Sequence, residues 1–263
     1  MHKFLVSILI LNYNNARFLD RSIKSCLNQS YKKLEILVFD DKSNDNSLSI
    51  LKKYKKKIKI IVNKHKKKGF AALDAKNGYY RLIENANGQI IFLLDSDDYF
   101  KKNKIQEIKK FYEKNNKIEF IQDLPLIQMK NQEEKKMNKN NLLSFWPYLS
   151  PESCISFRKS FVKNFKKKNR KLENDFKDVW FGFRLGVFAY FVNKSFYSLE
   201  KNLTIYKSYG ESKKYNTFNF NWFNRRLNSF NYLKKVSQNK INFNLNFDYV
   251  ITRFILSIFK ILK

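Results

Sequence analysis

The sequence predicts an α/β protein with a mostly parallel sheet flanked by helices and a helical extension at the C-terminal end. Three observations lead to this fold class. Nearly unbroken apolar runs, such as 4–11 and 90–94, are typical of strands buried on both faces of a sheet. Stretches with helical periodicity separate these runs, and strands joined by helices usually pair in parallel. Acidic residues follow two of the runs, at 40–41 and 95–98, where ligands of such sheets bind.

The first half of the chain alternates regularly between strands and helices. A helix over 18–28 has one apolar stripe, and Ser43 can cap a second helix. A third helix should stop at Gly88, because glycine is common just beyond helix ends. The expected strands are 4–11, 34–39, 58–62, 90–94 and 118–122, and the expected helices are 18–28, 43–54, 71–87 and about 105–112.

The second half gives weaker patterns. Residues 125–172 contain a polar stretch and a basic run that we leave unassigned. Residues 173–188 look helical, and 189–199 are typical of one or two strands.

A change of composition marks the last part of the chain. Residues 212–263 contain ten basic, one acidic and twelve aromatic residues. We therefore expect one domain over 1–210, with halves 1–115 and 116–210, and a basic, aromatic-rich helical extension over 211–263.

The extension ends in an amphipathic helix pattern. Arg253, Ser257 and Lys260 line one face. The other face is apolar and consists of Val250, Ile251, Phe254, Ile255, Ile258, Phe259 and Leu262. Such a helix suits an anionic membrane surface, and packing against the domain or a dimer contact is the alternative.

Composition narrows the classes of protein. Of the 263 residues 43% are hydrophobic, which is enough for a full core and excludes disorder throughout. The net charge of +30 favours nucleic acid or an anionic membrane as a partner, or reflects a biased composition rich in Lys, Asn, Ile and Phe.

Two cysteines, Cys26 and Cys154, cannot build a disulfide framework or a zinc cluster. We expect no bilayer-spanning segment, and the apolar N-terminal run lacks the cleavage pattern of a signal peptide.

The acidic cluster after residues 90–94 predicts a divalent cation site. Asp95 and Asp97 are carboxylates one residue apart, and oxygen ligands of this kind suit Mg²⁺ or Mn²⁺. Carboxylates this close repel each other unless a cation or a hydrogen-bond donor meets them. Aspartates at strand ends also commonly cap the next helix, so the pair alone leaves both interpretations open.

Four segments with polar strand ends occur in a fixed order. They are residues 6–14, 27–31, 35–47 and 87–98. In this order and spacing the set closely resembles the inverting nucleotide-sugar glycosyltransferases of family 2, which have the GT-A fold. The resemblance is strong over 4–115 and weaker over 150–200. It implies a GT-A-like, Rossmann-type sheet and a nucleotide-diphosphate sugar as donor.

The resemblance implies a role for each residue of the donor site. The nucleotide-sugar-binding residues would be Asn12, Tyr13, Asn14, Asp40, Asp41, Lys76, Asp95 and Ser96. The loop of Asn12 and Tyr13 would stack on or contact the nucleobase. Asp41, with Asp40 as the second candidate, would accept a hydrogen bond from a ring N–H of the base, and Asp95 would lie near the ribose. Asp97, with Asp95, would bind a Mn²⁺ or Mg²⁺ that bridges the diphosphate.

The family also carries a later acidic residue that acts as general base. It starts a helix and is followed by an aromatic residue and then by an arginine. Asp178, with Trp180 and Arg184 after it, matches this pattern, and Asp175 and Glu173 are the alternatives one turn earlier. Such a base takes the proton from an acceptor hydroxyl as that oxygen attacks the anomeric carbon.

The chain departs from the family pattern at three points. Leu11 and Asn12 stand where a Pro-Thr pair is usual, and Lys76 with Asn77 is the nearest equivalent of an Arg-Asn pair. The Gln-x-x-Arg-Trp motif of processive polysaccharide synthases is absent. We therefore expect transfer of a single sugar.

Together these observations predict a metal-dependent inverting glycosyltransferase that uses a glycan or lipid-linked hydroxyl acceptor. The expected setting is cell-surface polysaccharide or lipid-linked glycan synthesis, in the cytoplasm or peripherally at the inner face of the membrane. One alternative is an inactive GT-A-fold scaffold, which the altered residues 11–12 and 76–77 leave open. A nucleic-acid-binding protein explains the charge but gives no role to Asp95, Asp97 and Asp178, and a nucleotidyltransferase would need a glycine- and arginine-rich phosphate loop that is absent.

Overall fold

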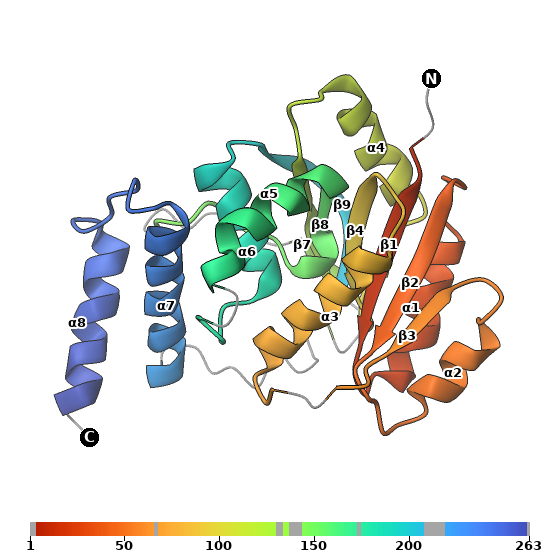
Figure 1. The fold of residues 1–263 in the computed structure, drawn as a ribbon, viewed down its shortest axis with the longest axis horizontal. Helices are drawn as coiled ribbons and strands as arrows, with labels where there is room; N and C mark the ends of the chain where they lie inside the picture. The colour runs from red at the N-terminus through yellow and green to blue at the C-terminus, as the bar shows by residue number, and fades with distance from the viewer. Residues whose placement is uncertain are drawn as a thin grey trace.

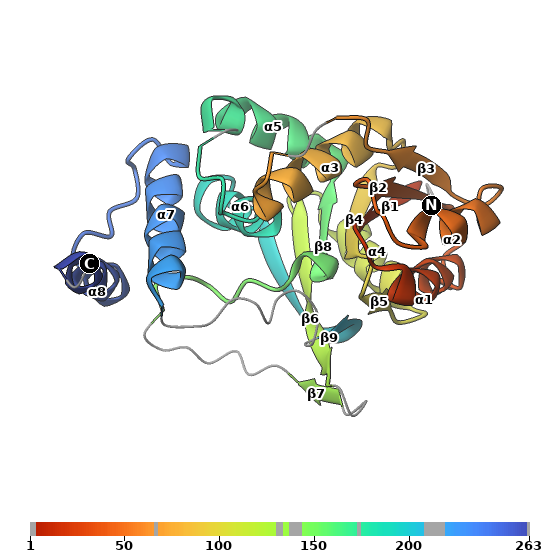
Figure 2. The same cartoon turned by 90° about the horizontal axis from the view of Figure 1, so that it is seen from below.

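The computed structural model describes residues 4–65, 68–129, 134–136, 144–172, 175–207 and 219–261. These residues build one nine-stranded sheet in the order β3-β2-β1-β4-β8-β6-β9-β5, with β7 paired to β6. Helices cover the sheet, and α7 and α8 stand side by side at one end of the molecule (Figures 1 and 2).

The strands are β1 Val6–Asn12, β2 Leu34–Asp40, β3 Lys59–Val62, β4 Ile90–Asp95, β5 Tyr99–Phe100, β6 Phe120–Gln128, β7 Glu134–Lys136, β8 Ile155–Arg158 and β9 Phe196–Lys207. The α-helices are α1 Ala16–Leu27, α2 Ser47–Lys53, α3 Ala71–Asn85, α4 Lys104–Lys114, α5 Lys159–Asn169, α6 Phe181–Val187, α7 Phe220–Val236 and α8 Phe247–Ile261. Two 3₁₀ turns, η1 Glu152–Cys154 and η2 Arg170–Leu172, and a π-helical turn, η3 Phe188–Val192, complete the described elements.

The predicted α/β class is confirmed, with a mixed and mostly parallel sheet. Strands β1 to β4 pair in parallel with one another, and β6 pairs in parallel with β9. Strand β8 joins these two groups because it runs antiparallel to both β4 and β6. The strands predicted at 4–11, 34–39, 58–62 and 90–94 all exist, with bounds that differ by two residues or fewer.

Two cores, one on each face of the sheet, explain the unbroken apolar runs. Leu9 of β1 faces a core that includes α3, α5 and α6. Its neighbours Ile8 and Ile10 face a second core that includes α1 and α4. Nearly every residue of such a strand is buried, so the sequence shows no alternation of apolar and polar positions.

The prediction that Ser43 caps a helix is wrong. Helix α2 begins at Ser47. The Ser43 N–H and hydroxyl both donate to the carboxylate of Asp40, at 2.9 and 2.8 Å. The serine therefore closes the loop that follows β2.

The helix predicted over 173–188 starts later, at Phe181. The buried guanidinium of Arg184 is the physical reason. It donates to four backbone oxygens, those of Leu172, Asp175, Phe176 and Val179, at 2.8 to 3.1 Å. The side chain thereby organises this segment as a turn, and Asp178 lies in the turn and not in α6.

The strand predicted at 189–199 begins only at Phe196. Its aromatic first part is η3, where the Asn193 N–H donates to the oxygen of Phe188 at 2.8 Å. Aromatic residues favour strands in general, but here Phe188 packs on Phe161 and Phe165 of α5. This α5 occupies most of the basic run that the sequence left unassigned.

The two C-terminal helices differ in burial. In α7, Phe230, Tyr232 and Leu233 are fully buried and belong to the same core as α5 and α6. In α8, Asp248, Thr252 and Leu256 are buried. The outer face of α8 and the turn before it are exposed and apolar, with Leu245, Phe247, Val250, Ile251, Phe254, Ile258 and Ile261. The predicted amphipathic helix therefore exists, and Leu262 of its predicted face lies outside the described residues.

Candidate functional site

The carboxyl ends of three parallel strands lie next to one another. Asn12 at the end of β1 pairs with Asp40 at the end of β2, and Leu11 pairs with Asp95 at the end of β4. The two acidic clusters therefore follow the strands on either side of β1, at the edge of the sheet where ligands of α/β proteins bind.

Asn12 and Asp40 are fully buried and bond to each other. The Nδ2 group of Asn12 donates to Oδ2 of Asp40 at 2.7 Å. Asp40 also accepts both hydrogen bonds from Ser43, so its carboxylate already holds the loops after β1 and β2 together. Oδ1 of Asn12 is buried and has no hydrogen-bond partner within the described residues, which leaves one acceptor open.

The loops beside this pair carry the other residues of the predicted base site. The side chain of Tyr13 is 50% exposed. Asn14 has a φ of 51°, and its Oδ1 accepts the Asn44 N–H at 2.9 Å. Asn63 donates from Nδ2 to Oδ1 of Asp41 at 2.6 Å. The structure thus brings Tyr13, Asn14 and Asp41 to the ends of β1 and β2.

Asp95 has a carboxylate whose pKa is perturbed. The hydroxyl of Tyr79 donates to its Oδ1 at 2.8 Å, and its own N–H donates to Oγ of Ser153 at 3.0 Å. Burial, and next the charge of Asp97, raises the pKa of Asp95 to about 7. A cation beside this carboxylate would favour its ionised form.

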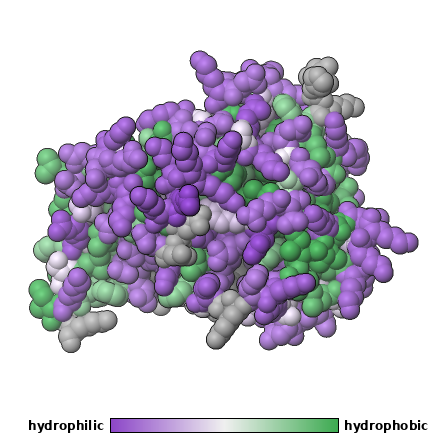
Figure 3. Space-filling view, viewed as in Figure 1, coloured by the Kyte–Doolittle hydropathy of each residue, from purple (hydrophilic) through white to green (hydrophobic). Residues whose placement is uncertain are grey.

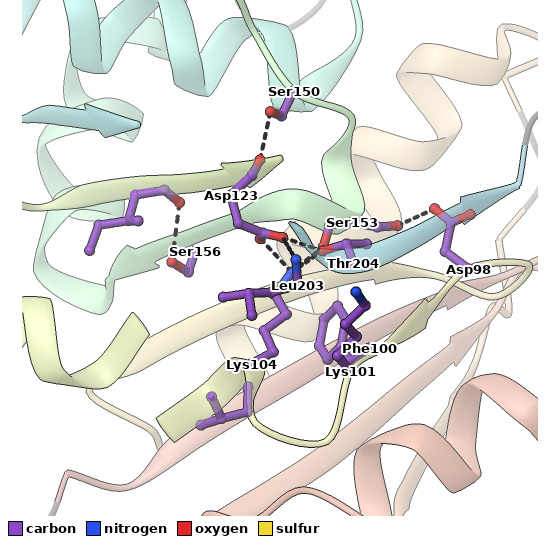
Figure 4. A network of polar contacts seen from close by, with 12 residues as sticks. Asp98, Phe100, Lys101, Lys104, Asp123, Ser150, Ser153, Ser156, Leu203 and Thr204 are labelled. Atoms are coloured by element: carbon purple, nitrogen blue, oxygen red, sulfur yellow. Dashed lines mark hydrogen bonds and ion pairs between the residues drawn. The ribbon is translucent and has the colours of Figure 1, made fainter. Parts of the chain in front are cut away.

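Asp97 and Asp98 have different surroundings. Asp98 is buried and accepts hydrogen bonds from the Ser153 hydroxyl at 2.6 Å and from the Lys207 N–H at 2.8 Å. It therefore joins β9 and η1 to the end of β4 (Figure 4). Burial raises the pKa of Asp97, while the charges of Lys207 and Arg21 lower it.

The carboxylates of Asp95 and Asp97 fit a hard divalent cation. Mg²⁺ is usually bound by one or two carboxylates together with substrate phosphates. No group of three or more His, Cys, Asp or Glu side chains within the described residues could hold an ion. That a diphosphate supplies further ligands stays a prediction.

Ser96 and Lys76 are both buried. The Nδ2 group of Asn15 donates to Oγ of Ser96 at 3.0 Å, which places Ser96 beside the start of α1. Lys76 lies on α3, with Nζ at 5.7 Å from the centre of the Tyr80 ring. Contacts of these two residues with a nucleotide sugar stay predictions.

Asp178, the predicted general base, lies three residues before α6. Both of its carboxylate oxygens accept hydrogen bonds from Nδ2 of Asn228, at 3.1 and 3.0 Å. Asn228 belongs to α7, so the C-terminal extension positions this residue. Of the alternatives, Asp175 pairs with Lys235 on the surface at 3.5 Å, and Glu173 lies outside the described residues.

Sequence reasoning missed Glu152, which lies in η1 next to Ser153. Its Oε1 accepts the Gly182 N–H at 2.6 Å. Burial, and next the charge of Asp95, raises the pKa of Glu152 to about 8. The sequence around Glu152 gives no sign of a functional residue. Its neighbours in space are distant in the chain: Asp95 at the end of β4 lies 57 residues before it, and Gly182 of α6 lies 30 residues after it.

In this protein a parallel group of strands with acidic carboxyl ends is extended by antiparallel pairing into one mixed sheet. This arrangement is the GT-A type of fold. A solved structure of this type is S. aureus TarS 1-349 in complex with UDP-GlcNAc, with a TM-score of 0.60, 18% identity and coverage of 97% of this chain and 71% of that one. The mannosyltransferase PcManGT from Pyrobaculum calidifontis, in complex with GDP-Man and Mn²⁺, matches with a TM-score of 0.55 and 10% identity over 100% and 76% of the two chains. At these identities the likeness shows the fold alone.

The chain belongs to glycosyl transferase family 2, because the model of this family matches residues 7–193. A curated relative is the E. coli UDP-Glc:alpha-D-GlcNAc-diphosphoundecaprenol beta-1,3-glucosyltransferase WfgD, 36% identical over 107 residues, which are 40% of this chain and 40% of that protein. An uncharacterized glycosyltransferase of Rickettsia felis is 42% identical over 118 residues, 45% of this chain and 19% of that protein. The matched part thus spans less than half of the length of these relatives.

Proposed function

We propose that the protein is a metal-dependent inverting glycosyltransferase that moves one sugar from a nucleotide-diphosphate sugar to a hydroxyl acceptor. The observation that carries this proposal is the acidic end of β4. There Asp95 and Asp97 crowd together so that burial and mutual charge raise the pKa of Asp95 to about 7. Family membership supports transfer of a sugar, and the two carboxylates support binding of a metal and a diphosphate here.

The donor's nucleotide would occupy the ends of β1 and β2. The half-exposed ring of Tyr13 offers a stacking surface for a base, while the buried Asn12 would hold this loop through its bond to Asp40. Asp41 would accept a hydrogen bond from a base N–H, while Asp40 would support this loop from its buried position. Asn14, Lys76 and Ser96 would complete the contacts to the nucleotide sugar.

The chemical step needs one base. Asp178 would take the proton of the acceptor hydroxyl while the acceptor oxygen forms a bond to the anomeric carbon and the bond from that carbon to the diphosphate breaks. Attack from the face opposite the diphosphate inverts the configuration. A Mn²⁺ or Mg²⁺ held by Asp97 and Asp95 would offset the charge on the departing diphosphate.

Metal-dependent nucleotide binding tests the donor site. We expect one of UDP, GDP, CDP and dTDP to bind with a micromolar Kd in the presence of Mn²⁺, in calorimetric titrations at a salt concentration that screens the net charge. Asp97→Ala should weaken this binding at least about tenfold, because a carboxylate that contacts the cation is lost. Asp20→Ala, which removes an exposed aspartate of α1, is the matched control and should bind like the wild type.

If no nucleotide shows metal-dependent binding, the proposed activity is wrong. The inactive scaffold and the nucleic-acid-binding protein are the two alternatives for that outcome. Nucleic acid is the less favoured partner, because it gives no role to the acidic residues at the end of β4. Salt-sensitive binding to RNA or DNA would identify it.

A membrane-proximal acceptor fits the outer face of α8. This face exposes Phe254 by 63% and Val250 by 49%, beside the exposed cations Arg253 and Lys260. Apolar side chains flanked by cations suit the anionic inner leaflet. Figure 3 shows apolar surface along the side of the molecule where α8 lies.

The name of the E. coli relative includes a diphosphoundecaprenol acceptor, which supports a lipid-linked glycan as acceptor here. None of the described helices is long and apolar enough to cross a bilayer.

Vesicle binding tests this surface. We expect the protein to sediment with vesicles that contain phosphatidylglycerol and much less with pure phosphatidylcholine vesicles, because anionic lipid adds attraction to the cations. Val250→Asp with Phe254→Asp should abolish most of the binding. The same change at Tyr190, which is 42% exposed on η3, is the control. Equal sedimentation of the α8 variant and the wild type would exclude α8 as the membrane contact.

A further inference from the structure

The 3₁₀ turn η1 is bonded directly to the acidic end of β4. Oγ of Ser153 accepts the Asp95 N–H at 3.0 Å and donates to Oδ2 of Asp98 at 2.6 Å. The backbone oxygen of Ser153 accepts a hydrogen bond from the buried Nζ of Lys104 at 2.7 Å. Three contacts on one residue therefore fix the position of its neighbour, Glu152, relative to Asp95.

The side chain of Glu152 reaches from this turn to α6. Its Oε1 accepts the Gly182 N–H at 2.6 Å. A Cβ at position 182 would lie 2.5 Å from Cγ of Glu152, so glycine permits this close approach. Because α6 directly follows the turn that contains Asp178, Glu152 connects the predicted metal site with the segment of the predicted base.

One oxygen of this carboxylate is left for a ligand. Within the described residues the Gly182 N–H is the hydrogen-bond donor to Glu152, and it meets Oε1 alone. The residue as a whole is partly exposed, and Oε2 is not one of the fully buried side-chain oxygens. Glu152 is near Asp95 because the Asp95 N–H is bonded to the adjacent Ser153 at 3.0 Å, and the charge of Asp95 contributes to the raised pKa of Glu152.

In an inverting transfer the leaving diphosphate and the acceptor oxygen lie on opposite sides of the anomeric carbon, so their positions determine where the donor sugar lies. The anomeric carbon must lie between the diphosphate, near Asp95 and Asp97, and the acceptor oxygen, near Asp178. In the structure Glu152 follows the same course, because its turn is bonded to Asp95 through Ser153 and its side chain accepts the Gly182 N–H of the helix that follows Asp178. We propose that Glu152 accepts a hydrogen bond from a hydroxyl of the donor sugar and so determines which sugar is transferred. This inference rests on the proposed function.

Hydroxyl groups are the chemistry that this carboxylate can recognise. The free oxygen of a carboxyl group accepts a hydrogen bond from a neutral O–H donor in either protonation state of the group. Epimeric sugars present their hydroxyls in different directions, so a fixed acceptor distinguishes them. A site that bonds a substrate hydroxyl rejects analogues that cannot supply it, because its own polar group then stays unpaired.

A comparison of nucleotides with and without sugar tests the proposal. We would titrate the wild type, Glu152→Gln and the control Glu134→Gln, an exposed glutamate of β7, with Mn²⁺ present. The probes are UDP, GDP, CDP and dTDP, and UDP-glucose, UDP-galactose, UDP-N-acetylglucosamine, GDP-mannose, CDP-glucose and dTDP-glucose. We expect Glu152→Gln to weaken binding of the preferred sugar nucleotide about tenfold or more and to change the order of affinities among the sugar nucleotides. The affinity for the bare nucleotide should stay within about threefold of the wild-type value.

Each other outcome has a distinct meaning. Unchanged affinity for the sugar nucleotide in a folded Glu152→Gln variant, judged by its Tm, would overturn the proposal. An equal loss for the bare nucleotide would also overturn it, because Glu152 would then act on the metal or on the shape of the site. Failure of the wild type to bind any bare nucleotide would refute the proposed function itself. Glu134→Gln should match the wild type in every titration.

Discussion

Replacing Asp178 with asparagine should abolish most of the transfer while donor binding is retained. A positioned general base typically contributes about 10²- to 10⁴-fold to the rate, so kcat should fall within this range. The introduced amide keeps an acceptor oxygen for Asn228, which bonds both oxygens of Asp178 at 3.0 to 3.1 Å, so the turn before α6 should keep its shape. The measurement is release of nucleoside diphosphate from the sugar nucleotide, with water as acceptor until a better one is found.

Asp175→Asn is the matched control for this prediction. Asp175 lies three residues earlier in the same turn, and its carboxylate pairs with the exposed Lys235, at 3.5 Å. We expect its kcat to stay within about threefold of the wild type, because an exposed ion pair contributes little. If Asp175→Asn instead loses the activity and Asp178→Asn keeps it, the assignment of the base is wrong.

The strands of the parallel half could be predicted because both of their faces are buried. In β1 every residue from Val6 to Ile10 is fully buried, so apolar character is required at nearly every position. Alternation of strands and helices predicts that these strands run in parallel, so Asp40 and Asp95 come to the same edge of the sheet, on either side of β1. Local patterns of this kind need no knowledge of distant contacts.

The second half could not be predicted well because distant contacts decide its structure. The carbonyls of Leu172, Asp175, Phe176 and Val179 bond to the guanidinium of Arg184, so a segment with helical periodicity stays a turn. In α5 the many lysines make the segment look like a solvent-exposed basic run. Its three apolar residues Phe161, Val162 and Phe165 are buried in the core, which the structure shows and the local sequence does not.

The same limit applies to the site. Its strand-end acids follow apolar runs in the sequence, whereas Glu152 becomes recognisable only when η1 is placed against β4 and α6. Asn228 is 50 residues from its partner Asp178 and lies in a segment that composition alone had separated from the catalytic domain. The boundary at 210 and 211 stays a prediction, since residues 208–218 lie outside the described ones.

Replacing Lys104 with methionine should cost about 3–5 kcal/mol of the free energy of unfolding, the usual effect of breaking a buried ion pair from one side. The Lys104 ammonium group lies 2.8 Å from Oδ1 of Asp123, and both side chains are 0% exposed. It also donates to the Ser153 oxygen at 2.7 Å and to the Thr204 hydroxyl at 2.5 Å (Figure 4). The variant leaves the Asp123 carboxylate buried without its cation. Urea unfolding measures the loss.

The pH dependence identifies this cause. Burial raises the pKa of Asp123, whereas the charge and the hydrogen bond of Lys104 lower it. The pKa of Asp123 should therefore rise further in Lys104→Met. A carboxyl group whose pKa is higher in the folded than in the unfolded state binds its proton more tightly when folded, so stability falls as pH rises through that interval. The deficit of the variant should therefore be larger at pH 8 than at pH 5.

Two further variants separate the ion pair from the loss of a long side chain. Lys24→Met removes an equal side chain from the exposed pair with Asp20, where Lys24 is 61% exposed, and should cost less than about 1 kcal/mol at either pH. Lys104→Met combined with Asp123→Asn removes the unpaired charge and should recover part of the loss, because the two residues interact directly. A deficit in Lys104→Met that is independent of pH and unchanged by Asp123→Asn would mean that packing, and not the charge of Asp123, makes Lys104 necessary.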